Sequence, residues 1–550
     1  MKKIILLFLI IPWVLQAQNY IKSADSCFKE RNYACAGIFY DRYLGSDNSN
    51  GIAQRALHSW ALSGDRDKTF SALHVFATNN YANGVIEFSQ QLLSDSSLAF
   101  IKQDARWNDF IQGVMAMEAN FKQQQQQAID SALAIQRELE SRGLLSKLDF
   151  SRDNAAGAFE KIATFNDYPF INRRYVSMQF KITDSLRTSF LVVLPENYDS
   201  HTSYPLLFFL HGAVFYNTGY PAIASASDTS GWNRFYTKYA GDVIMVYPRA
   251  NKRYNWMYPD DGFFMVPGIL KQVKQVINID DNRVFITGHS NGATGSFSYL
   301  VKQPSAFAGF YGFNTRPRVE TGGTYIKNIL NRSFFNVSTD SDYYYPPSAN
   351  DSLSALMKTI SADYQDHRYR GFPHWFPQFD QSEPVYKLLF ADLANRKRNP
   401  FHAVIYWECD DAKYGLCDWL QITSLDTTGK KAPWHQNQNF EIRKWVDAGN
   451  NKNFFMHDTL LPAFKYVKRS AAIRGSFKNN VFFIETSNIK SFSISLSPRM
   501  VDFKKPVTVI LNGKLYCKQK VSYSKEYMIK SFLSNLDRSA VWVNNIIITI

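Results

Sequence analysis

The sequence lacks a long hydrophobic run. After residue 17 it contains no stretch of about 18 apolar residues, the length that a membrane-spanning helix requires. The one earlier run, Ile4 to Ile11, is too short to cross a bilayer core of about 30 Å. We therefore expect no integral membrane span in the mature chain.

The short apolar run has the features of a secretory signal peptide. Two lysines precede it, a proline ends it, and Leu-Gln-Ala at 15–17 offers a cleavage site. We expect residues 1–17 to be removed near Ala17/Gln18 and the protein to be exported, periplasmic or extracellular. An uncleaved anchor is the alternative. Cys27 lies too far on to suggest a lipoprotein anchor.

Cysteine is scarce, with five residues in 550. No CxxC pair and no histidines at zinc-binding spacing accompany them, so no metal site is expected. Cys27 and Cys35 are eight residues apart, as are Cys409 and Cys417. In an oxidising compartment each pair could be bridged, which would leave Cys517 alone. Buried free thiols are the alternative.

The net charge is +14, with 62 basic and 48 acidic residues. Such an excess suits acidic polysaccharide, an anionic membrane surface or nucleic acid. The basic residues are spread along the chain, however, and export argues against nucleic acid as a partner. We favour simple solubility as the reason for the charge. Aromatic residues make up 15% of the chain, which is enough to build large cores.

The length predicts roughly three domains. Residues 18–115 show apolar residues at helical spacing, in two helix-turn-helix units of about 34 residues, and resemble tetratricopeptide repeats. We expect these helices either to bind a protein partner or to form a helical cap on the next domain. Residues 116–164 are expected to be a helical linker, with one helix ending near Gly143.

The two remaining segments differ in pattern. Residues 165–398 alternate continuous apolar runs with helical stretches, which predicts an α/β domain with a doubly wound, mostly parallel sheet. Residues 399–550 are strand-like, with a hairpin signal at Asn512-Gly513 and one helix near 525–536. We expect a mainly β C-terminal domain, a sandwich in outline, and hence a multidomain protein.

The segment FITGHSNGATGS at 285–296 carries the strongest chemical signal. Ser290 stands between Gly288 and Gly292, after a buried strand pattern and before a helix-like stretch. A nucleophilic serine on a sharp strand-to-helix turn requires such a setting, because small neighbours avoid clashes there. An ordinary turn serine is the alternative, and the flanking elements favour the nucleophile.

A serine nucleophile needs donors for the oxyanion that forms during acyl transfer. The backbone N–H of Asn291, directly after the serine, is one candidate. The second is expected in the loop that follows the strand-like LLFFL, from Gly212 or Ala213. His211 in that loop is expected to organise it rather than to act as the base.

An acid and a base must follow the serine in the chain. Asp340 and Asp342 both follow the strand-like FFNVS, and either could instead form an Asx-turn. Among the later histidines, only His374 stands in a loop between a strand-like and a helix-like segment. His367 lies within a strand pattern and His402 begins the next domain. His374 is therefore the expected base.

Residues 165–398 resemble the α/β-hydrolase fold, which uses the order serine, acid, histidine. The segment LPENYDSHTSYPLLFFLHG, the run at 280–284 that leads into GHSNGA, and GFPHWFP resemble secreted esterases of the polyhydroxybutyrate depolymerase and feruloyl esterase type, and related dipeptidyl-peptidase-like hydrolases. Asp342 lies four residues before Pro346, as the acid often does in such enzymes, although Thr339 replaces the usual glycine. This spacing favours Asp342 over Asp340.

Aromatic residues crowd the loops expected around the site and would suit a sugar or an aromatic acyl group, unless they only pack the loops. They are Tyr216, Tyr220, Trp256, Tyr258, Tyr343 to Tyr345 and Trp375. Among these we take Trp256 and Trp375, together with His211, as candidate substrate contacts.

The resemblance implies an exported serine hydrolase of carboxylic esters, including carbohydrate-linked acyl or feruloyl esters. Ser290, His374 and Asp342 would form an acyl-enzyme without a cofactor. Its partner would be a small-molecule or polysaccharide ester. The alternatives are a serine peptidase of the dipeptidyl-peptidase-like type and a non-catalytic binding protein on a hydrolase scaffold.

Overall fold

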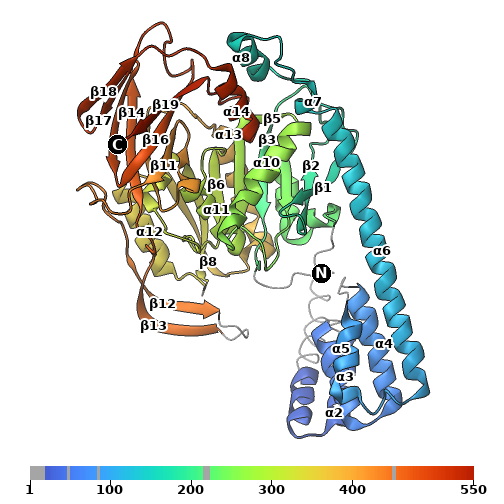
Figure 1. Ribbon diagram of the computed structural model, residues 1–550. Helices are drawn as coiled ribbons and strands as arrows, with labels where there is room; N and C mark the ends of the chain where they lie inside the picture. Colours follow the sequence, from blue (N-terminus) through green and yellow to red (C-terminus); the bar gives the residue numbers. More distant parts are fainter. Residues whose placement is uncertain (1–18, 46–49, 83–86, 215–222, 343, 449–453) are drawn as a thin grey trace, which may run out of the picture. The chain divides into compact units, whose positions relative to one another are not determined.

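The computed structural model describes residues 19–45, 50–82, 87–214, 223–342, 344–448 and 454–550 (Figure 1). The expected signal peptide at 1–17 lies outside these ranges. Contacts divide the chain into one unit of Met1–Ser131 with Gly219–Pro221, and a second of Ala132–Thr218 with Ala222–Ile550. In the part of the chain that is described, no helix combines the length and apolarity needed to cross a membrane.

The first unit is helical, as expected. Gly64, with φ of +77°, ends one helix, and the side chain of Asp65 caps the next by accepting from the Lys68 N–H at 3.0 Å. Leu57, Trp60 and the neighbouring helices share a buried core. The elements are the helix at 19–29, α2 (Tyr33–Leu44), α3 (Asn50–Ser63), α4 (Arg66–Ala82), α5 (Phe88–Ser94), and α6 (Ala105–Ser141).

The long helix α6 runs without a break through the expected boundary at residue 115. It ends at Ser141, close to Gly143 as predicted. Glycine is required at 143 because a Cβ there would lie 2.3 Å from the Gln275 carbonyl oxygen. The short helices α7 (Leu144–Lys147) and α8 (Ala155–Ala163) follow. The tetratricopeptide-like character of 18–115 and the domain boundaries themselves stay predictions.

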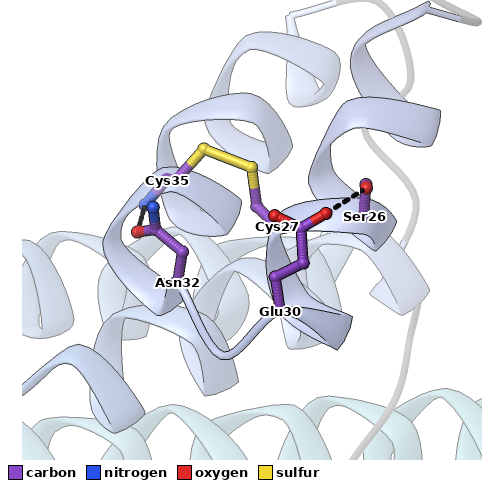
Figure 2. Close-up of a disulfide and its surroundings, with 5 residues drawn as sticks. All are labelled: Ser26, Cys27, Glu30, Asn32 and Cys35. Carbon is purple, nitrogen blue, oxygen red and sulfur yellow. Dashed lines mark hydrogen bonds between the residues drawn. A yellow bond between two sulfur atoms is a disulfide. The ribbon is translucent and has the colours of Figure 1, made fainter.

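Of the two cysteine pairs that could be bridged, one forms a disulfide. Figure 2 shows Cys27, from the first described helix, bonded to Cys35 in α2, with Cα atoms 5.8 Å apart. Asn32 between them caps α2 by accepting from the Cys35 N–H at 3.3 Å. Cys409 and Cys417 are not bridged and are both buried, which is the alternative of buried free thiols. The two residues lie on strands of different sheets, which their spacing in sequence does not reveal.

The second unit is built on an eight-stranded sheet in the order β1-β2-β4-β3-β5-β6-β7-β8. Strands β3 to β8 are parallel, and β1 and β2 join antiparallel at one edge. This is the mostly parallel sheet that the apolar runs predicted. The strands are β1 (Tyr175–Lys181), β2 (Arg187–Val193), β3 (Tyr204–Leu210), β4 (Ile244–Pro248), β5 (Ile279–Gly288), β6 (Gly309–Phe313), β7 (Ser333–Ser341) and β8 (Tyr364–Pro373).

Helices cover both faces of this sheet, so its central strands are buried on both sides. In β3, Phe208 belongs to the same core as α10 (Met265–Val276) and α11 (Asn291–Lys302). Its neighbour Phe209 packs in a second core with α9 (Arg234–Tyr239) and α13 (Glu383–Asn395). Helix α12 (Pro347–Thr359) lies between β7 and β8 in sequence (Figure 1). The arrangement is the doubly wound α/β architecture.

The C-terminal region is mainly β, with two sheets that share one core. Trp419, in the turn between β10 and β11 of one sheet, meets Phe477 and Phe482 of the other, with ring centroids 5.4 and 5.5 Å apart. Asn512 and Gly513 both have positive φ, at +49° and +79°, and form the predicted hairpin turn. One sheet has the order β10-β11-β16-β19 and the other β18-β17-β15-β14-β9, and β12 pairs with β13 alone.

The C-terminal elements have the following bounds. They are β9 (Val404–Cys409), β10 (Leu416–Cys417), β11 (Leu420–Leu425), β12 (Glu441–Ala448), β13 (Phe454–Pro462), β14 (Ala471–Lys478), β15 (Val481–Ser487), β16 (Ile489–Leu496), β17 (Val507–Leu511), β18 (Lys514–Gln519), α14 (Lys525–Asn535) and β19 (Asn544–Thr549).

Candidate active site

Ser290 lies on the sharp turn between β5 and α11. Its φ of +56° and ψ of −121° are unusual for a residue with a side chain. The turn is tight because Gly292 approaches the end of β3, where an added Cβ would lie 1.8 Å from the Leu210 carbonyl oxygen. A Cβ on Gly288 would lie 2.4 Å from the Gly292 carbonyl carbon. The two glycines therefore permit the elbow geometry that the pattern predicts.

The loop after β3 passes directly beside the serine. A Cβ on Gly212 would lie 3.1 Å from Ser290 Cβ and 3.7 Å from its Oγ. Ala213 has a positive φ of +55°. The Asn291 side chain ties this loop to α11, because its Oδ1 accepts from the Val214 N–H at 3.2 Å. The expected oxyanion segments are thus neighbours, and the role of the Asn291 side chain was not foreseen.

His211 organises this loop. Burial lowers the pKa of His211 to about 4, so its ring is neutral at pH 7. Its Nε2 accepts from the Ala250 N–H at 3.0 Å, and its Nδ1 then donates to the Gly212 carbonyl at 2.8 Å. In a trans peptide the N–H points opposite to the C=O, so the Ala213 N–H points away from His211. This geometry favours Ala213 over Gly212 as an oxyanion donor.

His374 and Asp342 are hydrogen-bonded to each other in the loops after β8 and β7. The Nδ1 of His374 lies 2.9 Å from Oδ2 of Asp342, and both side chains are buried. The same oxygen accepts from Asn314 Nδ2 at 2.9 Å, and Oδ1 accepts from the Tyr344 N–H at 2.8 Å. Three donors therefore orient one carboxylate. Asn314 follows β6 and was not identified from the sequence.

The second ring nitrogen of His374, Nε2, is buried and has no hydrogen-bond partner among the described residues. It is the nitrogen that the Asp342 contact leaves for proton transfer. Among the described residues, Nε2 forms no hydrogen bond to the Ser290 hydroxyl. Hydrogen bonds between a catalytic base and its nucleophile are often long before substrate binds.

Asp340 has a different environment from Asp342. It is exposed at the end of β7 and accepts from the Gly371 N–H at 2.7 Å. Its carboxylate braces the end of β8 rather than touching His374. Of the two candidate acids, only Asp342 contacts the histidine.

His289, the residue before the serine, forms a hydrogen bond to the backbone of His374, the candidate base. Burial lowers the pKa of His289 to about 3, so the ring is neutral. Its Nε2 donates to the carbonyl oxygen of His374 at 2.8 Å. The elbow and the histidine loop, 85 residues apart in sequence, are thereby joined. In the sequence, His289 stands at the variable position before the serine in G-x-S-x-G, and nothing else there pointed to this contact.

Three aromatic side chains gather around His374. Tyr344 lies 4.2 Å from its ring, Trp375 lies 5.0 Å away, and Trp232 meets Trp375 edge-to-face at 6.0 Å. Both indoles are 40% exposed, so a ligand could reach them. Trp232 was missed because its short helix η3 (Gly231–Asn233) lies in a loop without a clear pattern. Tyr216, Tyr220 and Tyr343 lie outside the described residues.

Trp256 does not have the position expected of a substrate contact. Its side chain is 0% exposed. It packs edge-to-face against His211 at 4.8 Å and fills the space left by Gly295, where a Cβ would lie 2.4 Å from its ring. The expectation that Trp256 contacts the substrate is therefore corrected: its side chain supports the loop that contains His211.

Among the described residues, no group of three or more His, Cys, Asp or Glu could hold a metal ion.

No family model matches the chain. Several solved structures are similar in part. A thermostable esterase shares 20% identity over 41% of this chain and 64% of that chain, with a TM-score of 0.33. A ferulic acid esterase shares 15% identity over 40% and 97%, with a TM-score of 0.32. Dipeptidyl peptidase 4 from Porphyromonas gingivalis shares 10% identity over 41% and 36%, with a TM-score of 0.33. Similarities at these TM-scores carry no argument about activity.

Proposed function

We propose that the protein is an exported serine hydrolase that cleaves carboxylic esters through Ser290, His374 and Asp342. The observation that carries the proposal is the buried 2.9 Å hydrogen bond between His374 and Asp342, in the loops after two parallel strands. The strained turn at Ser290 follows a third strand of the same sheet. Parallel strands bring their carboxyl ends to one edge, where a site can form.

In the proposed reaction His374 Nε2 removes the proton from Ser290, whose oxygen attacks the ester carbonyl. Asp342 holds the Nδ1–H and stabilises the imidazolium. The N–H groups of Asn291 and Ala213 stabilise the oxyanion. His374 then protonates the leaving alcohol, and water hydrolyses the acyl-enzyme with His374 again as base. The step requires only groups of this chain and water.

The aromatic side chains support an ester that carries a flat group. Trp375 and Tyr344 pack against the base, where the leaving alcohol must take up its proton, and Trp232 packs on Trp375. Exposed indoles suit a sugar or phenyl ring. A feruloyl or other carbohydrate-linked ester fits this environment. Export is supported by the Cys27–Cys35 disulfide, since such bonds persist in oxidising compartments.

The decisive experiment is covalent labelling with a fluorophosphonate. We expect wild-type protein to be labelled and Ser290→Ala not to be, while Ser71→Ala, at an exposed serine of α4, behaves like wild type. Equal labelling of Ser290→Ala would overturn the nucleophile assignment.

The candidate acid Asp342 has a matched control two residues earlier, Asp340 at the end of β7. Asp342→Asn should lower kcat for an aryl acetate by roughly 10³ to 10⁴-fold, as loss of the orienting acid does in serine hydrolases. Asp340→Asn should change kcat little.

Rates on aryl acetates, feruloyl esters and aminoacyl amides then separate esterase from peptidase. Faster turnover of aminoacyl amides would contradict the ester specificity.

A further inference from the structure

A second candidate site lies on the outer face of the C-terminal five-stranded sheet, apart from the serine. A cavity of about 490 Å³ opens there over β9, β14, β15 and β17. We refer to its floor, formed by outward-facing residues of these four strands, as the platform. We propose that the platform binds a neutral oligosaccharide. This inference does not rest on the proposed esterase activity.

The platform consists of two parallel cross-strand rows of opposite character. The polar row joins Tyr406, Arg474 and Glu485, which are direct cross-strand partners. The second row is apolar apart from one serine and consists of Val404, Ser476, Phe483 and Ile510, which are likewise paired across neighbouring strands. The rows are separated by two residues along each strand, or roughly 7 Å.

The apolar row is open to solvent. Val404 is 68% exposed and Phe483 is 49% exposed. Their inward neighbours Ile405 and Ile484 are buried, so the exposed pair belongs to the other face of the sheet. Because strands lie about 4.8 Å apart, a row of four strands extends over about 14 Å. That length suits several linked sugars rather than one.

The polar row is preorganised and carries one charge of each sign, with Lys327 Nζ beside it, 5.6 Å over the Tyr406 ring. The guanidinium of Arg474 lies over the Trp434 ring at 4.3 Å, and Tyr406 contacts the same ring at 6.3 Å. Arg474 meets Glu485 at a loose 3.5 Å, and both remain about half exposed. The pair therefore offers N–H donors and carboxylate acceptors without an unbalanced charge between them.

A sugar chain matches this pattern of chemistry. Each ring has an apolar C–H face that stacks on an aromatic side chain, and a rim of hydroxyls that both donate and accept. Phe483 would support the faces, while Arg474 and Glu485 would bind the hydroxyls at the rim. A purely apolar partner would bury the charged row, and a strongly acidic partner would meet Glu485.

The test is binding of unesterified oligosaccharides to the full-length protein. Isothermal titration with cellohexaose, xylohexaose and mannohexaose covers neutral chains, and oligogalacturonate serves as the acidic arm. We expect at least one neutral chain to bind. Phe483→Ala and Arg474→Ala should each weaken its affinity at least tenfold.

The matched control is Ile547→Ala, which removes another exposed apolar side chain (69% exposed) from the other sheet and should bind like wild type. Melting temperatures should be unchanged in all three variants. Three results would overturn the proposal: no neutral binding at millimolar ligand, binding of oligogalacturonate alone, or affinity unaltered by both platform variants. A concentration-dependent dimer abolished by Phe483→Ala would assign the platform to self-association instead.

Discussion

At the scale of single residues, two neutral histidines stand behind the candidate site. His289 donates to the His374 carbonyl, and His211 donates to the Gly212 carbonyl. A neutral ring satisfies both contacts, and His211 must be neutral because its Nε2 accepts from the Ala250 N–H. Burial enforces this state, since it lowers the pKa of His289 to about 3 and that of His211 to about 4.

These pKa values predict that acid destabilises the fold. Both lie below the unfolded value of about 6.5, so the unfolded chain binds more protons once the pH falls below 6.5. The free energy of unfolding should therefore keep its full value above pH 6.5. It should decrease as the pH falls toward the pKa values that the two histidines have in the folded protein. For His289 the loss is up to about 1.4 kcal/mol per pH unit.

Urea unfolding at pH 7.5 and pH 5.0 measures this effect. His289→Gln, which cannot titrate, should lose less stability between the two pH values than wild type does. The control His201→Gln replaces an exposed histidine and should retain the wild-type difference. An identical loss in His289→Gln and wild type would contradict the assignment.

Asn314 and Asp342 illustrate how far residue-level prediction reached. Asp342 was preferred over Asp340 from its spacing to Pro346, and it is the one that contacts His374. Asn314 was not foreseen, because its Nδ2 reaches Asp342 from the end of another strand. An isolated Asn after an apolar run resembles any turn residue, so only the fold reveals the contact.

At the scale of elements, the elbow depends on how closely α11 approaches β3. Gly292 allows that approach, and Gly113 in α6 provides a contrast, since among the described residues no atom lies within 4 Å of a Cβ added there. The two glycines are both helical, but only Gly292 is needed for packing.

We expect Gly292→Ala to unfold or severely destabilise the protein, because its Cβ would overlap the Leu210 carbonyl oxygen. Gly113→Ala should stabilise α6 by roughly 0.5 to 1 kcal/mol, since alanine favours helix more than glycine does. Thermal melts of the two variants test the pair. A Gly292→Ala protein that melts like wild type would show that the turn can relax.

Strands and helices were predicted well where apolar residues ran without interruption or recurred at helical spacing. β3, β5 and the end of α6 near Gly143 lie where these patterns indicated. For Cys409 and Cys417 the sequence left a bridge and buried free thiols both open, and the structure shows buried free thiols on strands of two different sheets. Pairing of strands is decided by contacts between distant segments.

At the scale of the molecule, residues 165–398 and the C-terminal β region belong to one compact unit. Arg398, at the expected boundary, is buried and forms an ion pair with Asp537 at 2.7 Å. Neighbouring positive charge holds the pKa of Asp537 well below its usual range. The pair anchors the segment after α14 to the segment after α13.

We expect Arg398→Met to cost about 3 to 5 kcal/mol of stability, because it leaves the Asp537 carboxylate buried without its partner. The double variant Arg398→Met with Asp537→Leu should recover part of that loss, since no buried charge then remains. Chemical denaturation of both single variants and the double variant forms the cycle. Additive losses would show that the two side chains are not coupled.

The sequence by itself determined the helical, α/β and mainly β character of the three regions and singled out Ser290, His374 and Asp342 as candidates, because periodicity, small residues and chain order are local or linear properties. Tertiary structure decided which sheet each strand joins, that Trp256 is buried, and that His289, Asn314 and Trp232 contact or line the candidate site. These features arise from contacts between segments tens to hundreds of residues apart, and no local pattern encodes such proximity.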